Sequence, residues 1–229
     1  MVGNCKWKTA LELLGRLRWL GMTLQRAAPF EYSIGNVIRR IMLIVREEYA
    51  GLLDAKGPEG PSLGDVLRGG DEEVAMDVAL GPELLHNVME QIVELYGDAQ
   101  NAVESSASQA RQHVNENDGV MTVGNSDEVY EFLKQVPKKN VEIIVVETAP
   151  SLEGHELAAR LLSSGRGVVG VPESSVFALM SRVHKVILPA HAVLADGSLL
   201  TSASAFVAAL AAKHASVQVL CLASLYQLC

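Results

Sequence analysis

Residues 119–147 read GVMTVGNSDEVYEFLKQVPKKNVEIIVVE, and this stretch decides the fold of the second half of the chain. Two short apolar runs, 120–123 and 141–147, flank a segment with helical periodicity, 127–136. The runs are continuously apolar rather than alternating, which is typical of parallel strands covered on both faces. The stretch therefore predicts a strand–helix–strand unit of a parallel sheet.

The same alternation continues toward the C-terminus. Further strands are predicted at 167–171, 185–188 and 217–222, and further helices at 153–163, 174–182 and 202–214. Together they predict a Rossmann-like α/β domain over residues 118–229. The chain ends at Cys229, directly after the fifth predicted strand. We therefore expect a domain that is truncated at its C-terminus.

The first half of the chain has helical periodicity instead. Helices are predicted for Thr9–Leu24 and for 82–116. Between them, after a break at Pro29, a helix is predicted that runs through Leu53 with Ser33 as its N-cap. Residues 56–71 are rich in glycine and proline and are expected to form a loop or linker. The predicted fold class is α/β, with a helical N-terminal domain over residues 1–117 followed by the Rossmann-like domain.

Composition narrows the possible functions. The chain has 229 residues and a net charge of −8, which argues against nucleic acid as a direct partner. No apolar run approaches the ~18 residues that span a bilayer, and the N-terminus has no signal-peptide core. We therefore expect no membrane partner and a cytoplasmic protein. The three cysteines form no CxxC pair and the six histidines are dispersed, so we expect no metal site.

One motif suggests a nucleotide cofactor but stands in the wrong context. Residues 165–170, GRGVVG, match the GxGxxG pattern. The dinucleotide fingerprint follows a strand and opens a helix, whereas here a predicted helix comes first and a strand follows. We interpret Gly165 as a helix-terminating turn and predict no cofactor.

Ligands of such folds bind outside the carboxyl ends of the strands. The loops predicted there carry six carboxylates against one histidine, His191: Asp127, Glu128, Glu147, Glu153, Glu173 and Asp196. This charge opposes a phosphorylated substrate, and the serines of these loops are ordinary helix caps. No catalytic residue is predicted. His155, at the start of a predicted helix, is interpreted as structural or solvated, and His191 as the better pocket residue.

Three arginines lie on or beside the polar side of the second predicted helix: Arg39, Arg40 and Arg46. Such a stripe is most often a solvated helix face. On an acidic chain it also suits an acidic or phosphorylated protein surface. Both interpretations stay open at this stage.

Five blocks in order resemble the beta-type subunits of the initiation factor 2B alpha/beta/delta family, over roughly residues 8–228. They are GNVIRR (35–40) with VREEY (45–49), MTVGNS (121–126) with VYEFLK (129–134), ETAP (147–150) with EGHELA (153–158), FALMSRV (177–183) with KVI (185–187), and LADGSL (194–199) with LAAKH (210–214). Five blocks in the same order are far more specific than any lone motif.

The resemblance implies a regulatory subunit rather than an enzyme. It implies assembly with alpha-, delta- and catalytic-type subunits into a complex that exchanges guanine nucleotide on initiation factor 2. It also implies that the alpha, beta and delta subunits together sense phosphorylation of that factor. The family's C-terminal segment is missing here, and the spacing before Gly35 is shorter than usual.

Related sugar-phosphate isomerases, such as methylthioribose-1-phosphate isomerase, share the fold. The resemblance places Gly124 and His191 where those enzymes carry a catalytic Cys and Asp. Because glycine offers neither acid nor nucleophile, we expect a vestigial pocket at Gly124 and His191. The alternatives are an isomerase with shifted catalytic groups and a small-molecule sensor that uses this crevice.

Overall fold

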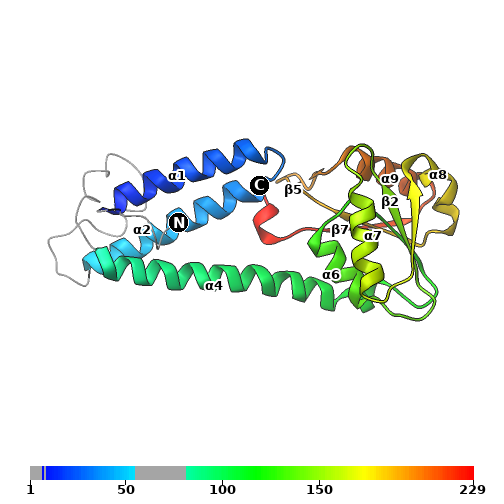
Figure 1. The fold of residues 1–229 in the computed structure, drawn as a ribbon, viewed down its shortest axis with the longest axis horizontal. Coiled ribbons are helices and arrows are strands. Elements are labelled where there is room, and N and C mark those ends of the chain that lie inside the picture. Colours follow the sequence, from blue (N-terminus) through cyan, green and yellow to red (C-terminus); the bar gives the residue numbers. More distant parts are fainter. Residues whose placement is uncertain (1–6, 8, 55–80) are drawn as a thin grey trace. The chain divides into compact units, whose positions relative to one another are not determined.

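The computed structural model of the protein describes Trp7 and residues 9–54 and 81–229 (Figure 1). The loop predicted at 56–71 lies outside the described residues. Contacts divide the chain into two compact units, 1–98 and 99–229. The division falls inside helix α4, Gly81–Ser108, whereas the predicted domain boundary at 117/118 marks where helical periodicity ends. The extent of each independently folding domain stays a prediction.

The helical unit contains α1, Ala10–Ala27, α2, Ser33–Asp54, and the first part of α4. Thr9 caps α1, because its hydroxyl accepts the Glu12 N–H at 3.3 Å. The helix ends just before Pro29. Ser33, predicted as the N-cap of the next helix, is instead the first residue of α2. In Figure 1, α1 and α2 run side by side.

The core of this unit is a small cluster of buried leucines, valines and alanines with one buried tyrosine, Tyr49. Leu13, Leu14 and Leu17 from α1 meet Val45 of α2 in this cluster. Leu84 and Val88 of α4 complete it, as expected for helices that bury one apolar stripe each.

The helix predicted for 82–116 is interrupted. It forms α4 and the short α5, Ala110–His113, with a break at Gln109. The hydroxyl of Ser108 donates to the carbonyl of Ser105 at 2.7 Å. Serine side chains that bond to the backbone in this way weaken the regular helix ladder, which apolar periodicity does not reveal.

The second unit is built on a five-stranded parallel sheet of order β3-β2-β1-β4-β7. Its strands are β1, Gly119–Val123; β2, Glu142–Glu147; β3, Val168–Pro172; β4, Lys185–Pro189; and β7, Gln218–Leu222. Every pairing is parallel, which confirms the predicted Rossmann-like α/β fold.

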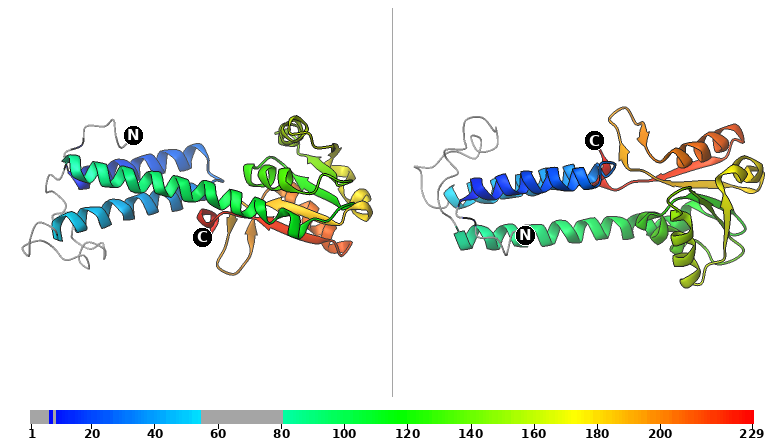
Figure 2. Two further views of the ribbon diagram at one scale, coloured as in Figure 1. Left: turned by 90° about the horizontal axis from the view of Figure 1, so that it is seen from below. Right: turned by 45° about the horizontal axis from the view of Figure 1, so that its top comes forward.

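Helices cover both faces of the sheet (Figure 2). On one face α6, Asp127–Gln135, and α7, Glu153–Ser163, pack on Val120, Ile143 and Ile187. On the other face α8, Val176–Leu179, and α9, Ala203–His214, pack on strand residues that include Met121 and Ile144. The central strands are therefore buried on both sides, as their continuous apolar runs predict.

Three features differ from the sequence prediction. A hairpin of two-residue strands, β5, Ala192–Val193, and β6, Leu199–Leu200, follows β4. Two-residue strands are too short to show the apolar pattern from which a strand is predicted in a sequence. The helix predicted at 174–182 divides into two 3-10 turns around α8. Strands β3 and β7 are partly exposed because they form the sheet's edges; Val169, for example, is 45% exposed.

Candidate functional site

The candidate site lies at the carboxyl ends of β1 and β4. In the sheet, β2 and β3 lie to one side of β1, and β4 and β7 lie to its other side. The direction in which the chain adds strands therefore reverses between β1 and β4. Gly124 follows β1 with a φ of +72°, which favours glycine. His191 follows β4, and its N–H donates to the carbonyl of Leu200 at 2.8 Å. The two predicted pocket residues thus follow adjacent strands.

A carboxylate lies beside Gly124. A Cβ atom added at position 124 would stand 3.6 Å from Oε2 of Glu153, the first residue of α7. Glu153 is stabilised there by the positive end of the helix dipole. An anionic group approaching Gly124 therefore meets a negative charge rather than the backbone N–H groups and cations of a phosphate site.

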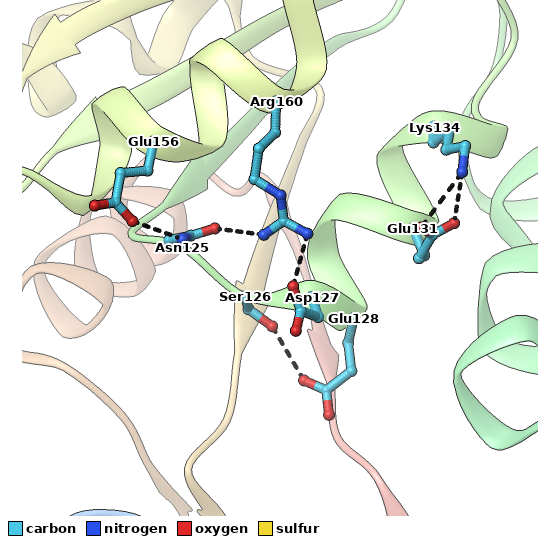
Figure 3. A network of polar contacts seen from close by, with 8 residues as sticks. All are labelled: Asn125, Ser126, Asp127, Glu128, Glu131, Lys134, Glu156 and Arg160. Atoms are coloured by element: carbon cyan, nitrogen blue, oxygen red, sulfur yellow. Dashed lines mark hydrogen bonds and ion pairs between the residues drawn. The ribbon is translucent and has the colours of Figure 1, made fainter. Parts of the chain in front are cut away.

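A polar network joins the loop after β1 to α7 (Figure 3). Arg160 donates to Asn125 Oδ1 at 3.1 Å and to Asp127 Oδ1 at 2.6 Å. Asn125 in turn donates to Glu156 Oε2 at 3.2 Å. The Arg160 guanidinium also stands 4.2 Å from the centre of the Tyr130 ring, a cation–π contact. Arg160 is already engaged on several sides by these groups.

Glu128 borders a cavity of about 260 Å³ on the same side of the unit. Its Oε2 accepts a hydrogen bond from Ser126 at 3.1 Å (Figure 3). The other lining residues are small or apolar and include Ser105, Leu222 and Ser224. Burial, and then the Glu128 carboxylate, raise the pKa of the Cys221 thiol. A thiol with a raised pKa is a poor nucleophile.

His155 contributes more to the site than its sequence position indicated. Its Nδ1 contacts Oε2 of Glu147, the last residue of β2. Glu147 has a side chain only 19% exposed, whereas the His155 side chain is 74% exposed. Both line a cavity of about 300 Å³ with Gly154, Ala158 and residues of β3. The His–Glu pair was missed because its members, eight positions apart, belong to different elements.

The six predicted carboxylates do not gather at one point. Asp127 and Glu128 follow β1, Glu153 begins α7, and Glu147 ends β2. Asp196 lies in the β5–β6 turn, where it accepts bonds from Ser198 Oγ at 2.5 Å and Ser198 N at 2.9 Å. These bonds lower the pKa of Asp196, the side-chain bond most. Its role is to close a turn.

The GxGxxG match is a helix end, as predicted. Gly165 has a φ of +80° and its N–H donates to Leu162, while the Arg166 N–H donates to Leu161. This pair of bonds is the Schellman motif. The glycine therefore terminates α7, and no phosphate cradle forms at this position.

The three arginines of α2 lie in the helical unit. Arg39 and Arg40 are exposed, and Arg46 is half-buried. Arg39 Nη1 donates to Asn36 Oδ1 at 2.6 Å, which fixes its guanidinium along the helix. Nothing in the geometry of this unit alone assigns them a partner.

Metal-ligating side chains do not converge within the described ranges: no group of three or more His, Cys, Asp or Glu is arranged to hold a metal ion there. Over the same residues, Cys221 and Cys229 form no disulfide. The described helices include none with the length and apolarity that crossing a bilayer requires.

Comparison with known proteins agrees with the fold and with the sequence blocks. The chain is 33% identical over 265 residues to translation initiation factor eIF2B subunit beta of Dictyostelium discoideum, covering 98% of this chain and 68% of that one. It superposes on a chain of the tetrameric eIF2B beta2-delta2 complex of C. thermophilum with a TM-score of 0.70 and 27% identity, covering 100% and 69% of the two chains.

A more distant similarity links the chain to an enzyme. It is 22% identical over 224 residues to ribose 1,5-bisphosphate isomerase of Pyrococcus furiosus, covering 97% of this chain and 61% of that one. The initiation factor 2 subunit family model matches residues 1–229. With this match over the full sequence, the chain belongs to the initiation factor 2 subunit family.

Proposed function

We propose that this chain is a beta-type regulatory subunit of eIF2B. Similarity to eIF2B beta over 98% of the chain carries this proposal. In this proposed role, the chain assembles with alpha-, delta- and catalytic-type subunits in the cytoplasm and acts on initiation factor 2. Nucleotide exchange, and its control by phosphorylation of that factor, then belong to the whole complex rather than to this chain.

The pocket chemistry supports a non-enzymatic role. We infer that Gly124 and His191 replace the Cys and Asp of the related isomerases. Glycine supplies no proton-transferring group, and Glu153 stands beside it. A bisphosphate substrate approaching Gly124 would meet this carboxylate at close range, which disfavours binding.

Co-purification tests the proposal. The tagged full chain, recovered from its native cell extract, is expected to bring alpha-, delta- and catalytic-type subunits and initiation factor 2, identified by mass spectrometry. The isolated chain is expected to leave ribose 1,5-bisphosphate unchanged. Recovery of a homodimer alone, together with turnover of that sugar, would reject the regulatory role in favour of an isomerase.

We also propose that Arg39, Arg40 and Arg46 contribute to the contact with partner subunits. Replacing all three with Ala is expected to weaken recovery of the partners roughly tenfold, because each charge at an interface rim contributes a fraction of a kcal/mol to about one. Quantitative pull-down at fixed salt measures this.

The control is Lys138→Ala with Lys139→Ala, which removes two exposed cations from the α/β unit, against three in the arginine variant. Circular dichroism and a thermal melt of each variant establish that the fold is retained. An equal loss of partners in both variants, or no loss in the arginine variant, contradicts a specific role for this stripe.

A further inference from the structure

The cavity of about 300 Å³ beside α7 is separate from the crevice between β1 and β4. On the strand side it is lined by Val145 and Gly170, which are register partners in β2 and β3. On the helix side it is lined by Gly154 and Ala158 of α7. Among the described residues its lining comes from α7, β2 and β3 alone, all within the unit 99–229. The cavity therefore belongs to a single unit of the chain.

Small residues leave this space open beside β3. Successive strand residues point to opposite faces of a sheet, and Val171 packs on the face that α8 and α9 cover. A side chain at Gly170 would therefore point toward α7, yet a Cβ atom added there has nothing within 4 Å. Ala158 contributes only a methyl group from α7. The start of α7 is held against β2, because a Cβ atom at Gly154 would stand 2.7 Å from the carbonyl oxygen of Val146.

One carboxylate borders the cavity. The Glu147 side chain is only 19% exposed. Its Oε1 accepts the Thr148 N–H at 3.2 Å, and its Oε2 contacts Nδ1 of His155. A carboxylate offers about four lone-pair sites, so both oxygens keep capacity for a further donor. The lining residues include neither lysine nor arginine. A hollow lined by one sign of charge attracts the opposite sign, here a cation.

The start of α7 also borders the cavity and would by itself favour an anion. Its first turn, however, carries two carboxylates, Glu153 and Glu156. The His155 N–H already donates to the carbonyl of Leu152 at 3.1 Å. The two carboxylates offset the positive end of the helix dipole, so the charge of Glu147 decides the sign of the ligand.

We propose that this cavity binds a small organic ammonium ion, whose head group donates to Glu147 and whose short apolar chain lies along Val145 and Gly170. Apolar walls with one polar group are typical of small-molecule sites. At about 30 Å³ for each water-sized group, the cavity holds roughly ten non-hydrogen atoms. His155, with a side chain 74% exposed, turns into solvent to admit the head group. The inference does not depend on the proposed subunit role, which co-purification tests separately.

The test uses the full chain with hexylamine, a cation at neutral pH, and hexan-1-ol, its uncharged match. Ligand-observed NMR titration measures the two dissociation constants. Hexylamine is expected to bind at least about tenfold more tightly, because hydrogen bonds between charged groups are stronger than those of neutral ones. Equal affinity for the two probes would overturn the proposal.

Two glutamine variants separate a specific site from the general attraction of an acidic chain. Glu147→Gln keeps the shape of the side chain and is expected to weaken hexylamine binding at least about tenfold, with hexan-1-ol within about twofold. Glu142→Gln removes a carboxylate from the other end of β2 and is the matched control, with both probes within about twofold. Equal losses of hexylamine affinity in the two variants would reject the site.

A pair of glycine variants locates the apolar chain. Gly170→Leu fills the cavity and is expected to abolish binding of both probes. Gly167→Leu is the control, because a Cβ atom there also has nothing within 4 Å but the residue lies outside the cavity. Circular dichroism and a thermal melt establish that each variant folds. Binding that persists in a folded Gly170→Leu variant would overturn the proposal, and if this variant does not fold, the glutamine variants still decide.

Discussion

Gly154→Val is expected to destabilise the α/β unit by about 4 kcal/mol, among the largest effects of a single substitution. A Cβ atom at this position would stand 2.7 Å from the carbonyl oxygen of Val146 and 3.1 Å from Cα of Glu147. Both atoms belong to the backbone of β2 and cannot rotate away. The start of α7 would have to lift off the sheet, and buried contacts of Leu157 and Leu161 would be lost with it.

Gly154→Ala provides a graded version of the same change. Alanine gains up to about 1 kcal/mol of helix propensity, whereas overpacking costs about 1–3 kcal/mol. Because the clash is with backbone, we expect a net loss of about 2 kcal/mol and a fall in Tm of roughly 7 °C. Gly167→Ala, where nothing lies within 4 Å of the added carbon, is the control and should change stability by less than about 0.5 kcal/mol. Equal melting temperatures for both alanine variants would contradict this account.

Arg166→Met is expected to cost about 3 kcal/mol. Arg166 is only 6% exposed, and its guanidinium donates to the carbonyls of Lys134, of Val136 at 2.5 Å and of Pro137 at 3.2 Å. These carbonyls lie in the last turn of α6 and directly after it, where no helical N–H is available. Methionine keeps the volume but leaves them without a donor in a partly buried place, and hydrogen bonds to charged donors contribute about 1.5–3 kcal/mol each.

Arg166→Lys separates charge from geometry. Burial, and then the nearby Arg111, lower the pKa of Arg166, so the position disfavours a cation and holds it through its hydrogen bonds. A lysine reaches fewer carbonyls from one nitrogen, and we expect it to recover less than half of the loss. Arg182→Met, which removes an exposed pair with Glu142 at 3.0 Å, is the control and should cost at most about 1 kcal/mol. Urea denaturation of the three variants measures these losses of unfolding free energy. An Arg166→Met variant as stable as the Arg182→Met control would contradict the capping role.

Local signals were enough to predict most of the α/β unit. Helix α7 begins and ends at the predicted residues, and β1 and β2 lie within one residue of their predicted bounds. Apolar runs and capping residues such as Ser202, whose hydroxyl accepts the N–H of Ala205, act over a few positions and are visible in one sequence.

The candidate site was predicted only in part. Gly124, Asp127 and Glu153 follow from the order of strands and helices, because the carboxyl ends of parallel strands share an edge. The Glu147–His155 pair and the several contacts of Arg160 depend on how closely α7 approaches β2. The approach is set by the contact of Gly154 with the backbone of β2, and the spacing of apolar residues in the sequence does not predict this contact.

The strand order also sets the sequence in which the sheet can assemble. On one side β1 pairs with β2, Gly119 with Glu142, only 23 positions later; on the other it pairs with β4, Val120 with Lys185, 65 positions later. Closing the longer loop costs more chain entropy and delays the contact. During synthesis, a nascent chain that has just completed β3 therefore holds three of the five strands, with the edge of β1 open until β4 leaves the ribosome. This interval is when aggregation or chaperone capture competes with folding.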